Sequence, residues 1–487
     1  MSIKLYNTFT GAKEEFKPLN AGQVKLYVCG VTVYDHCHIG HARSAIVFDV
    51  IHRHLKTRGF DVVFAKNFTD IDDKILRKAN TEGIPWKEVG EKYIGSYKED
   101  MKDLNILPPT FEPKATDHID DMIRLVESLL EKGHAYRVDD DVYFSVNSFP
   151  GYGRLSNRSL DEMMAGARVD VDERKKNPLD FALWKGSKEG EPFWDAPFGK
   201  GRPGWHIECS VMSAKYLGVP FDIHGGGKDL VFPHHENERA QSEAADGRRF
   251  VNYWIHNGFV NIEKEKMSKS LGNFLLIKDF LKDYHPEVLR LFFLATQYRN
   301  PVDYTDKSIE DTNSALQRLY YTLTRTYEME KDRGIAAKQF PEVADLEKKY
   351  YDAMDDDFNT ALALTSVFEL SKMINRMLDE HDESGYPSAL YARDTLLSLA
   401  QGIGLLHDDL TAFSEKEKTR HLVLVDLNVP AIERMIEERV QARKNKDYTR
   451  SDEIRDLLAR KGVLLNDTPA GTDWRIKSVV MAKGENR

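Results

Sequence analysis

Two short apolar runs separated by an amphipathic segment open the chain, and this pattern constrains the fold more than any other feature. The runs are Lys25–Thr32 and Val62–Ala65, and the apolar residues of His41–Leu55 between them recur at helical spacing. A strand, a helix and a second strand of these lengths form a right-handed unit with parallel strands. Ligands of such sheets bind beyond the carboxyl ends of the strands. We therefore predict an α/β fold with a doubly wound parallel sheet and a ligand site near Cys29 and His38.

A change of composition interrupts this pattern and divides the chain. Between about Pro113 and Pro203 an amphipathic helix, three consecutive aspartates and stretches with Gly, Pro and Trp replace the α/β signals, which resume from Trp205 to Val260. The pattern is helical from about Ser308 to Leu406, and charged helices follow. The predicted domains are a doubly wound α/β domain (1–115 and 204–262), an insertion (116–203), a region with a basic loop (263–307), a helical bundle (308–406) and a C-terminal domain (407–487).

Composition and cysteine usage exclude several classes of protein. The chain has 69 Lys and Arg against 79 Asp and Glu, a formal net charge of −10, so nucleic acid must be held by local basic surface. The chain has three cysteines, Cys29, Cys37 and Cys209. Such a small, odd number argues against a disulfide framework and is typical of a reducing compartment. The first residues contain no long apolar segment and no later stretch approaches membrane-spanning length, so we expect neither a secretory leader nor a membrane span. We predict a cytoplasmic protein whose cysteines serve a metal site or catalysis.

The segment His38-Ile39-Gly40-His41 carries groups that suit phosphate chemistry. It lies where the first strand gives way to the helix, and a helix N-terminus favours phosphate through its backbone N–H groups and its dipole. Gly40 permits close approach to the backbone, while His38 and His41 can stabilise charge on a phosphate. A helix cap with surface histidines explains the same segment about as well.

A second segment, Lys266-Met267-Ser268-Lys269-Ser270, is a basic loop of small residues. The ammonium groups of Lys266 and Lys269 match the charge on a leaving pyrophosphate, and Ser268 and Ser270 offer hydroxyl donors. Taken alone, the loop is more often a solvated basic segment. Together, the two motifs HIGH and KMSKS resemble those of the class I aminoacyl-tRNA synthetases, and this resemblance implies catalytic roles for His38, His41, Lys266 and Lys269.

Sulfur, imidazole and carboxylate donors recur in two further segments. Cys209 stands in GWHIECS, and FPHHENE contains His234 and Glu238, which share one face of a helix if the segment is helical. With Cys29 they form a donor set that suits zinc, although each cysteine alone is more often a small buried hydrophobe. Both segments resemble the zinc site of cysteinyl-tRNA synthetases. The resemblance implies one zinc ion per chain, which binds the sulfur of the substrate cysteine. It gives Cys37 no role in the site, so we expect Cys37 to be a packing thiol.

The resemblance covers almost the full length and implies further site residues. In NFTDIDDK it places Thr69 near the substrate amino group, and it makes Trp205 and His206 walls of the cysteine pocket. The alternatives are a helix cap for Thr69 and a core position for Trp205. The glycine-rich segment DIHGGGKDL implies a nucleotide site, whose implied ATP-binding residues are Gly40, Gly225, Gly226, Gly227, Asp229, Ser268 and Ser270.

The function implied by the resemblance is activation of L-cysteine with ATP to cysteinyl-adenylate and pyrophosphate, with Mg²⁺ on the phosphates, followed by transfer to the 3′ end of tRNA(Cys). It implies a monomer with a Rossmann-like catalytic domain, a connective insertion, a KMSKS-bearing stem-contact region, a DALR-type bundle and a C-terminal anticodon-binding domain. One alternative is a ligase that transfers activated cysteine to an amino-sugar, which has no use for the C-terminal region. Another is a non-catalytic RNA-binding paralogue, which is expected to have lost phosphate or zinc residues.

Overall fold

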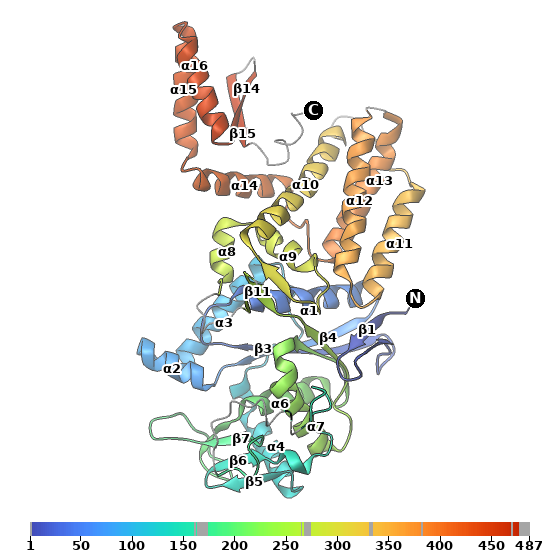
Figure 1. The fold of residues 1–487 in the computed structure, drawn as a ribbon, viewed down its shortest axis with the longest axis vertical. Coiled ribbons are helices and arrows are strands. Elements are labelled where there is room, and N and C mark those ends of the chain that lie inside the picture. Colours follow the sequence, from blue (N-terminus) through green and yellow to red (C-terminus); the bar gives the residue numbers. More distant parts are fainter. Residues whose placement is uncertain are drawn as a thin grey trace. The chain divides into compact units, whose positions relative to one another are not determined.

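The computed structural model describes residues 2–159, 162, 174–263, 265–266, 274–330, 335–380, 383–468 and 471–476 (Figure 1). The chain forms two compact units. The first comprises Met1–Ile277, Phe293–Tyr304 and Lys349–Leu364, and the second comprises Lys278–Phe292, Thr305–Lys348 and Thr365–Arg487. No helix within the described ranges has the length and apolar character needed to cross a bilayer.

A four-stranded parallel sheet with the order β10-β9-β3-β4 is the centre of the first unit. Its strands are β3 (Gln23–Thr32), β4 (Asp61–Thr69), β9 (Phe221–Gly227) and β10 (Val251–Asn257). The chain leaves β3 through helix α1 (Ile39–Thr57) to β4 on one side, and β9 and β10 are added on the other side. This reversal of direction defines a doubly wound sheet. The predicted α/β fold and its opening strand-helix-strand unit are confirmed.

The alternation of side chains along β3 divides the core of the first unit between the two faces of the sheet. Val24, Leu26 and Val28 belong to the cluster that includes the α1 side chains. Tyr27 and Cys29 belong to the opposite cluster, which contains residues of α4 (Ile119–Glu131) and α6 (Trp205–Leu217). A shift of the register by one residue would turn Cys29 toward α1, so the pairing of β3 fixes the face on which its thiol lies.

Further elements of the first unit lie between β4 and β10 or flank the sheet. Between β4 and β9, helices α2 (Asp73–Glu82), α3 (Trp86–Asp103) and α4 precede an antiparallel sheet, and α7 (Glu236–Asp246) links β9 to β10. The antiparallel sheet consists of β5 (Ala135–Val138), β6 (Asp141–Phe144), β7 (Phe181–Gly186) and β8 (Gly201–Pro203). Short strands complete the unit: β1 (Lys4–Asn7), β2 (Ala12–Glu15), β11 (Val260–Ile262), β12 (Glu265–Lys266) and β13 (Val302–Tyr304).

The second unit is mainly helical. The helices that lie in it wholly or in part are α8 (Ile277–Asp283), α9 (Pro286–Leu294), α10 (Asp306–Glu330), α11 (Pro341–Asp355), α12 (Thr360–Asp379), α13 (Tyr386–Gly402), α14 (Leu410–Leu424), α15 (Val429–Lys444) and α16 (Tyr448–Arg460). A hairpin of β14 (Val463–Thr468) and β15 (Gly471–Ile476) follows. A small core of α14, α15, α16 and β14 side chains, which includes Leu422, Ile432 and Leu458, holds the C-terminal elements together.

Gly30 marks a close approach between the backbones of β3 and β4. A Cβ atom added at Gly30 would lie 1.5 Å from the carbonyl oxygen of Asn67, and the register of the two strands shifts between Val28 and Val31. The N–H group of Gly30 donates to Oδ1 of Asn67 at 2.9 Å. A side chain at this position therefore requires the two strands to separate.

We expect Gly30→Ala to lower the free energy of unfolding by about 3 kcal/mol, because the added methyl group collides with backbone atoms that cannot rotate away. Urea unfolding followed by circular dichroism measures the change. Gly95→Ala in α3 is the matched control, because nothing lies within 4 Å of its added Cβ. Alanine also favours a helix interior by about 1 kcal/mol relative to glycine. Equal unfolding midpoints for parent and Gly30→Ala would contradict the close approach.

Candidate active site

Four buried side chains from separate elements meet near the carboxyl end of β3. Cys29 comes from β3, Cys209 from α6, His234 from the irregular turn Val231–His235, and Glu238 from α7. One ligand atom of each lies within 4.8 Å of the others. The two Sγ atoms are 3.6 Å apart, and Oε1 of Glu238 lies 3.2 Å from Sγ of Cys29 and 3.0 Å from Nε2 of His234. The structure thus brings together the residues that the sequence nominated as a metal site.

The protonation states in this cluster favour one thiolate. Burial alone would raise the pKa of Cys209, but the hydrogen bond from the Cys29 thiol and the contact with His234 lower this pKa to about 6. Burial, together with the neighbouring Cys209, raises the pKa of Cys29 well above its usual value. Against the effect of burial, His224 and His234 hold the pKa of Glu238 well below its usual range. Cys209 and Glu238 are therefore the anionic members.

The chemistry of these donors fits a divalent metal ion. Thiolate, imidazole and carboxylate groups are the ligands that zinc takes in proteins. Cys209 is 2% exposed and Glu238 is fully buried, so their negative charges have little access to water. Buried charge is stable only when it is paired or bound to a metal. All three cysteines lack disulfide bonds, and Cys37 is buried outside this cluster.

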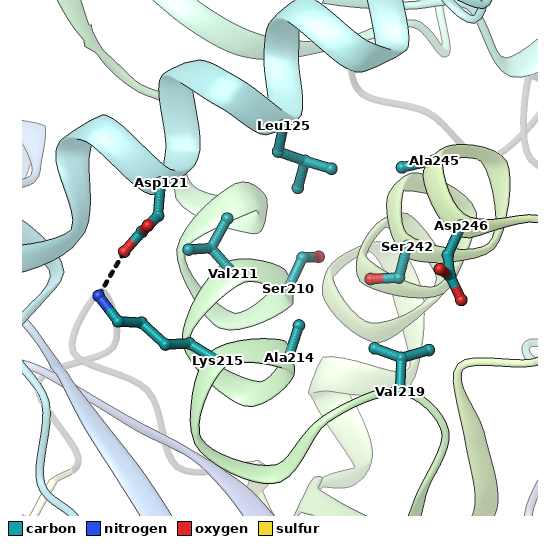
Figure 2. Close-up of a pocket in the computed structure, with 10 residues that line it drawn as sticks. All are labelled: Asp121, Leu125, Ser210, Val211, Ala214, Lys215, Val219, Ser242, Ala245 and Asp246. Carbon is teal, nitrogen blue, oxygen red and sulfur yellow. Dashed lines mark hydrogen bonds and ion pairs between the residues drawn. The ribbon is translucent and has the colours of Figure 1, made fainter.

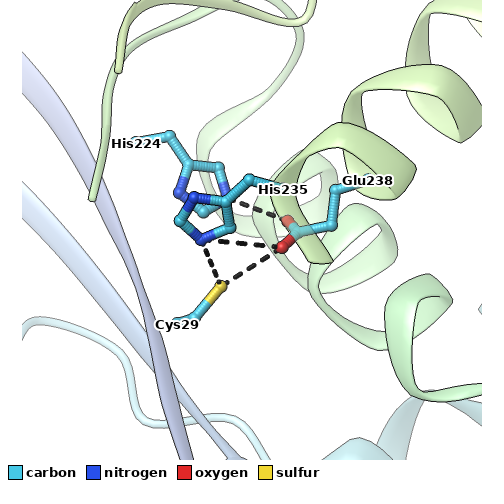
Figure 3. A group of neighbouring side chains, drawn as sticks. All are labelled: Cys29, His224, His235 and Glu238. Atoms are coloured by element: carbon cyan, nitrogen blue, oxygen red, sulfur yellow. Dashed lines mark hydrogen bonds and ion pairs between the residues drawn. The ribbon is translucent and has the colours of Figure 1, made fainter. Parts of the chain in front are cut away.

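A second group shares Cys29 and Glu238 with the first (Figure 3). Nε2 of His235 lies 3.3 Å from Sγ of Cys29, and Nε2 of His224 lies 2.8 Å from Oε2 of Glu238. Nδ1 of His235 in turn lies 2.8 Å from Nε2 of His256, and burial lowers the pKa values of both rings. The two imidazoles of this group therefore hold the thiol and the carboxylate in place. Sequence reasoning missed His224 and His235, although both stand inside the quoted motifs.

The residues nominated for the cysteine pocket surround the same cluster. Trp205 stacks on His234 with ring centroids 4.2 Å apart and is 40% exposed, so it is not a core residue. Nδ1 of His206 lies 2.9 Å from Nδ1 of His234. The hydroxyl of Thr69 donates to Oε2 of Glu208 at 2.6 Å, whereas the cap of α2 is Asp72, so the helix-cap alternative for Thr69 is wrong. Burial raises the pKa of Glu208, a residue that the sequence did not single out.

The HIGH motif forms the N-terminus of α1. Nδ1 of His38 accepts from the N–H of Gly40 at 3.1 Å, and Nδ1 of His41 accepts from the N–H of His38 at 3.2 Å. The two rings stack with centroids 3.8 Å apart. The helix-cap alternative is therefore observed. It is compatible with phosphate chemistry, because a neutral ring whose Nδ1 accepts carries its proton on Nε2 and can donate from there.

The glycine-rich segment Gly225–Gly227 forms the last residues of β9, at the carboxyl edge of the sheet. A Cβ atom at Gly225 would lie 2.1 Å from the ring of Phe48, and one at Gly226 would lie 2.9 Å from the ring of His235. At Gly227 the nearest atom would be Oδ1 of Asp229, at 2.5 Å. Packing inside the protein already requires small residues at Gly225 and Gly226, whatever ligand binds there.

The KMSKS loop falls largely outside the described residues. Ser268, Lys269 and Ser270 are not among them. For Lys266 the structure describes the backbone only, which pairs with Asn261 where β12 meets β11. The roles expected of these residues therefore rest on the sequence.

Comparison with known proteins identifies the family. Residues 15–314 match the model of the tRNA synthetases class I (C) catalytic domain, and residues 349–407 match the DALR domain. The cysteine–tRNA ligases of Geobacter metallireducens and Geobacter sulfurreducens are 53% and 52% identical, across 98% of this chain and 100% of theirs. The chain belongs to the cysteine–tRNA ligase family. This membership confirms the predicted class I synthetase and ATP-dependent ligase.

Solved class I synthetases share the fold of this family member. Mycobacterium tuberculosis methionyl-tRNA synthetase in complex with methionyl-adenylate has a TM-score of 0.62 at 16% identity, with 84% of this chain and 94% of that chain covered. Agrobacterium radiobacter K84 LeuRS in its ternary complex has a TM-score of 0.59 at 12% identity, with 80% and 84% covered. The ligase relatives match the C-terminal region as well, so the amino-sugar ligase is not favoured.

Proposed function

We propose that this protein activates L-cysteine with ATP and transfers the cysteinyl group to the 3′ end of tRNA(Cys). The meeting of Cys29, Cys209, His234 and Glu238 at the carboxyl edge of a class I sheet carries the proposal. The first step is in-line attack of the cysteine carboxylate on the α-phosphate of ATP, which releases pyrophosphate. In the second step a ribose hydroxyl of the terminal adenosine takes the cysteinyl group, so no covalent enzyme nucleophile is needed.

In this proposal the four-residue cluster holds one zinc ion, which supplies a soft cation that prefers the sulfur of cysteine to the hydroxyl of serine. His224 and His235 keep Glu238 and Cys29 oriented through the contacts described above. Trp205, which stacks on His234 of the cluster, forms a wall of the cysteine pocket in this proposal. Such selection matters, because an apolar pocket separates near-isosteres by only about 10- to 200-fold.

The phosphates of ATP are assigned to the other motifs. His38 and His41 donate from Nε2 to the phosphate that gains charge, and Lys266 and Lys269 match the charge on the leaving pyrophosphate. ATP is bound with Mg²⁺ on its phosphates. Asp229 accepts hydrogen bonds from the ribose hydroxyls, and the backbone around it lets the nucleotide approach. The remaining residues of this site are Gly40, Gly225, Gly226, Gly227, Ser268 and Ser270.

The domain roles and the cellular setting are part of the same proposal. Residues 1–115 and 204–262 form the catalytic domain, 116–203 the connective insertion and 263–307 the stem-contact region. Residues 308–406 form the DALR-type bundle, and 407–487 recognise the anticodon through stacking and phosphate contacts. The protein acts as a monomer in the cytoplasm.

The hydroxyl of Thr69 is expected to position the amino group of cysteine. We expect Thr69→Val to raise the KM for cysteine about tenfold with little change in kcat, because one hydrogen bond of about 1.4 kcal/mol is lost in substrate binding. ATP–pyrophosphate exchange at varied cysteine measures both constants. Thr69→Ser keeps the hydroxyl and is expected to retain the parent KM. Equal KM values for the valine and serine variants would remove this role.

The experiment that tests the function is transfer of labelled cysteine onto total tRNA by the purified protein with ATP, with labelled serine as the control amino acid. Charging with cysteine and not with serine is the expected result. Formation of cysteinyl-adenylate without charging of RNA would favour the amino-sugar ligase. Absence of both reactions would favour the non-catalytic paralogue.

A further inference from the structure

The imidazole of His206 has one nitrogen in a hydrogen bond and a second nitrogen that is open. Nδ1 lies 2.9 Å from Nδ1 of His234, a member of the metal cluster. Nε2 has no hydrogen-bond partner among the described residues, and it is not one of the unpartnered side-chain nitrogens that are sealed from water. The residue as a whole is half-buried. One nitrogen of the ring therefore contacts a proposed metal ligand, and the other is available to a substrate.

The protein fixes the position of this ring before any substrate binds. Helix α6, which carries His206, is joined to α4 by the ion pair of Lys215 with Asp121, whose atoms are 2.7 Å apart (Figure 2). The ring of Phe181 on β7 meets the ring of His206 edge-to-face, with centroids 5.6 Å apart. The ring of Trp205 lies on it at 5.1 Å. The open nitrogen thus has a defined place beside the metal cluster.

The metal cluster determines which nitrogen of His206 carries the proton. Nε2 of His234 is the nitrogen on the side of the cluster, 3.0 Å from Oε1 of Glu238. An imidazole that binds a metal through one nitrogen keeps its proton on the other and donates it to a neighbouring acceptor. Nδ1 of His234 is therefore the donor toward Nδ1 of His206. Because Nδ1 of His206 accepts, this ring carries its proton on Nε2.

A donor at Nε2 limits which group of a bound cysteine can lie there. In the proposed site the thiolate of cysteine binds the metal, and the α-ammonium group offers only N–H donors. The carboxylate is the remaining group, and it accepts hydrogen bonds. His206 also stands in the first turn of α6, where the helix dipole favours negative charge. The carboxylate is therefore the group that Nε2 can recognise.

We propose that His206 is a specificity-determining residue, whose Nε2–H group donates a hydrogen bond to the carboxylate of cysteine. This role rests on the function proposed above, in which His206 is otherwise only a wall of the cysteine pocket. His234 fixes the direction of the hydrogen bond, so neighbouring side chains recognise the sulfur and the carboxylate of one molecule. One carboxylate oxygen takes the hydrogen bond, and the other stays available for attack on the α-phosphate of ATP.

A comparison of L-cysteine with cysteamine, which is cysteine without its carboxylate, tests this contact. Both affinities are measured without ATP, by isothermal titration calorimetry on the zinc-loaded, full-length protein. We expect His206→Asn to weaken the binding of cysteine about tenfold, because one hydrogen bond to a charged group is lost, and to leave cysteamine unchanged. The amide oxygen of asparagine replaces Nδ1 as the acceptor for His234. Unchanged affinity for cysteine, or an equal loss for both ligands, would overturn the proposal.

His206→Gln is the conservative variant, because its amide N–H group can take the place of Nε2–H. It should bind cysteine within about threefold of the parent affinity. A loss as large as that of His206→Asn would contradict the donor role. Where a variant fails to fold, nuclear magnetic resonance of isotope-labelled histidines reads the tautomer of His206 in the zinc-loaded parent protein. A proton on Nε2 is expected, and a proton on Nδ1 would overturn the proposal.

ATP–pyrophosphate exchange by the parent protein tests the proposed function separately. A parent protein that prefers cysteine to cysteamine but does not activate cysteine would overturn that function and would support the contact with His206. A parent protein that activates cysteine, together with a His206→Asn protein that binds cysteine as tightly, would overturn the donor role alone.

Discussion

Cys209→Ser is expected to lose the bound zinc ion and to lower kcat/KM for cysteine activation about a thousandfold, a loss of about 4 kcal/mol of transition-state stabilisation. Cys209 is the thiol whose pKa falls to about 6, so it is the sulfur that is anionic at neutral pH. A serine hydroxyl is neutral there and is a harder donor, which zinc binds less well. Without the metal, the described residues of the pocket supply no soft cation to distinguish sulfur from oxygen.

Two measurements check this expectation. Mass spectrometry of the dialysed protein gives the zinc content, and ATP–pyrophosphate exchange with cysteine and with serine gives the discrimination. Cys37→Ser is the matched control, because Cys37 is equally buried but lies outside the metal cluster. The control should keep its zinc and its activity. Full zinc content in a folded Cys209→Ser protein would remove Cys209 from the site.

The sequence was sufficient to predict the elements that place the metal cluster. The apolar runs on either side of the first helix predicted a parallel unit, and the carboxyl end of its first strand does carry Cys29. The spacing of His234 and Glu238 predicted a shared helix face, although His234 lies in an irregular turn before α7. Their Nε2 and Oε1 atoms nevertheless lie 3.0 Å apart. Spacing along the sequence therefore predicted the contact of His234 with Glu238, because these two residues lie one helical turn apart.

The partners that hold this cluster in place could not be read from spacing. His224 on β9 reaches Glu238 because α7, which follows β9, packs on the sheet face that carries Tyr27 and Cys29. Glu208 reaches Thr69 across the contact of α6 with β4. These pairs depend on long-range packing, which periodicity within one element does not specify. At Gly225 the sequence predicted a nucleotide contact. The structure adds a packing requirement that the sequence did not reveal, because a Cβ atom there would collide with the ring of Phe48.

The boundaries of the two units also depend on long-range packing, which patterns within single elements do not specify. Lys349–Leu364 belongs to the first unit although its neighbours in sequence are helices of the second. Asp355 holds this segment through His54 and Arg58, and Asp357 holds it through the N–H of Tyr6 and the hydroxyl of Tyr298. A helical pattern reveals α11 and α12 but not that the carboxylates of Asp355 and Asp357, near their junction, bind residues distant in the sequence.

His38→Asn separates the two roles that the first histidine of the HIGH motif combines. Asparagine is among the best N-cap residues, so the hydrogen bond to the N–H of Gly40 is retained and the free energy of unfolding should change by less than about 0.5 kcal/mol. The donor at Nε2 is lost, however. Removal of one donor that stabilises transition-state charge lowers kcat about 10²- to 10³-fold. We expect this loss in ATP–pyrophosphate exchange at saturating cysteine and ATP.

His38→Ala completes the comparison, because it removes both the cap and the donor. It should lose the same activity as His38→Asn and in addition about 1 kcal/mol of stability, measured by urea unfolding. If His38 served only as a helix cap, His38→Asn would keep the parent kcat and His38→Ala alone would be impaired. The pair therefore distinguishes a structural imidazole from a catalytic one at a position where the hydrogen bond of Nδ1 to Gly40 leaves the proton of a neutral ring on Nε2.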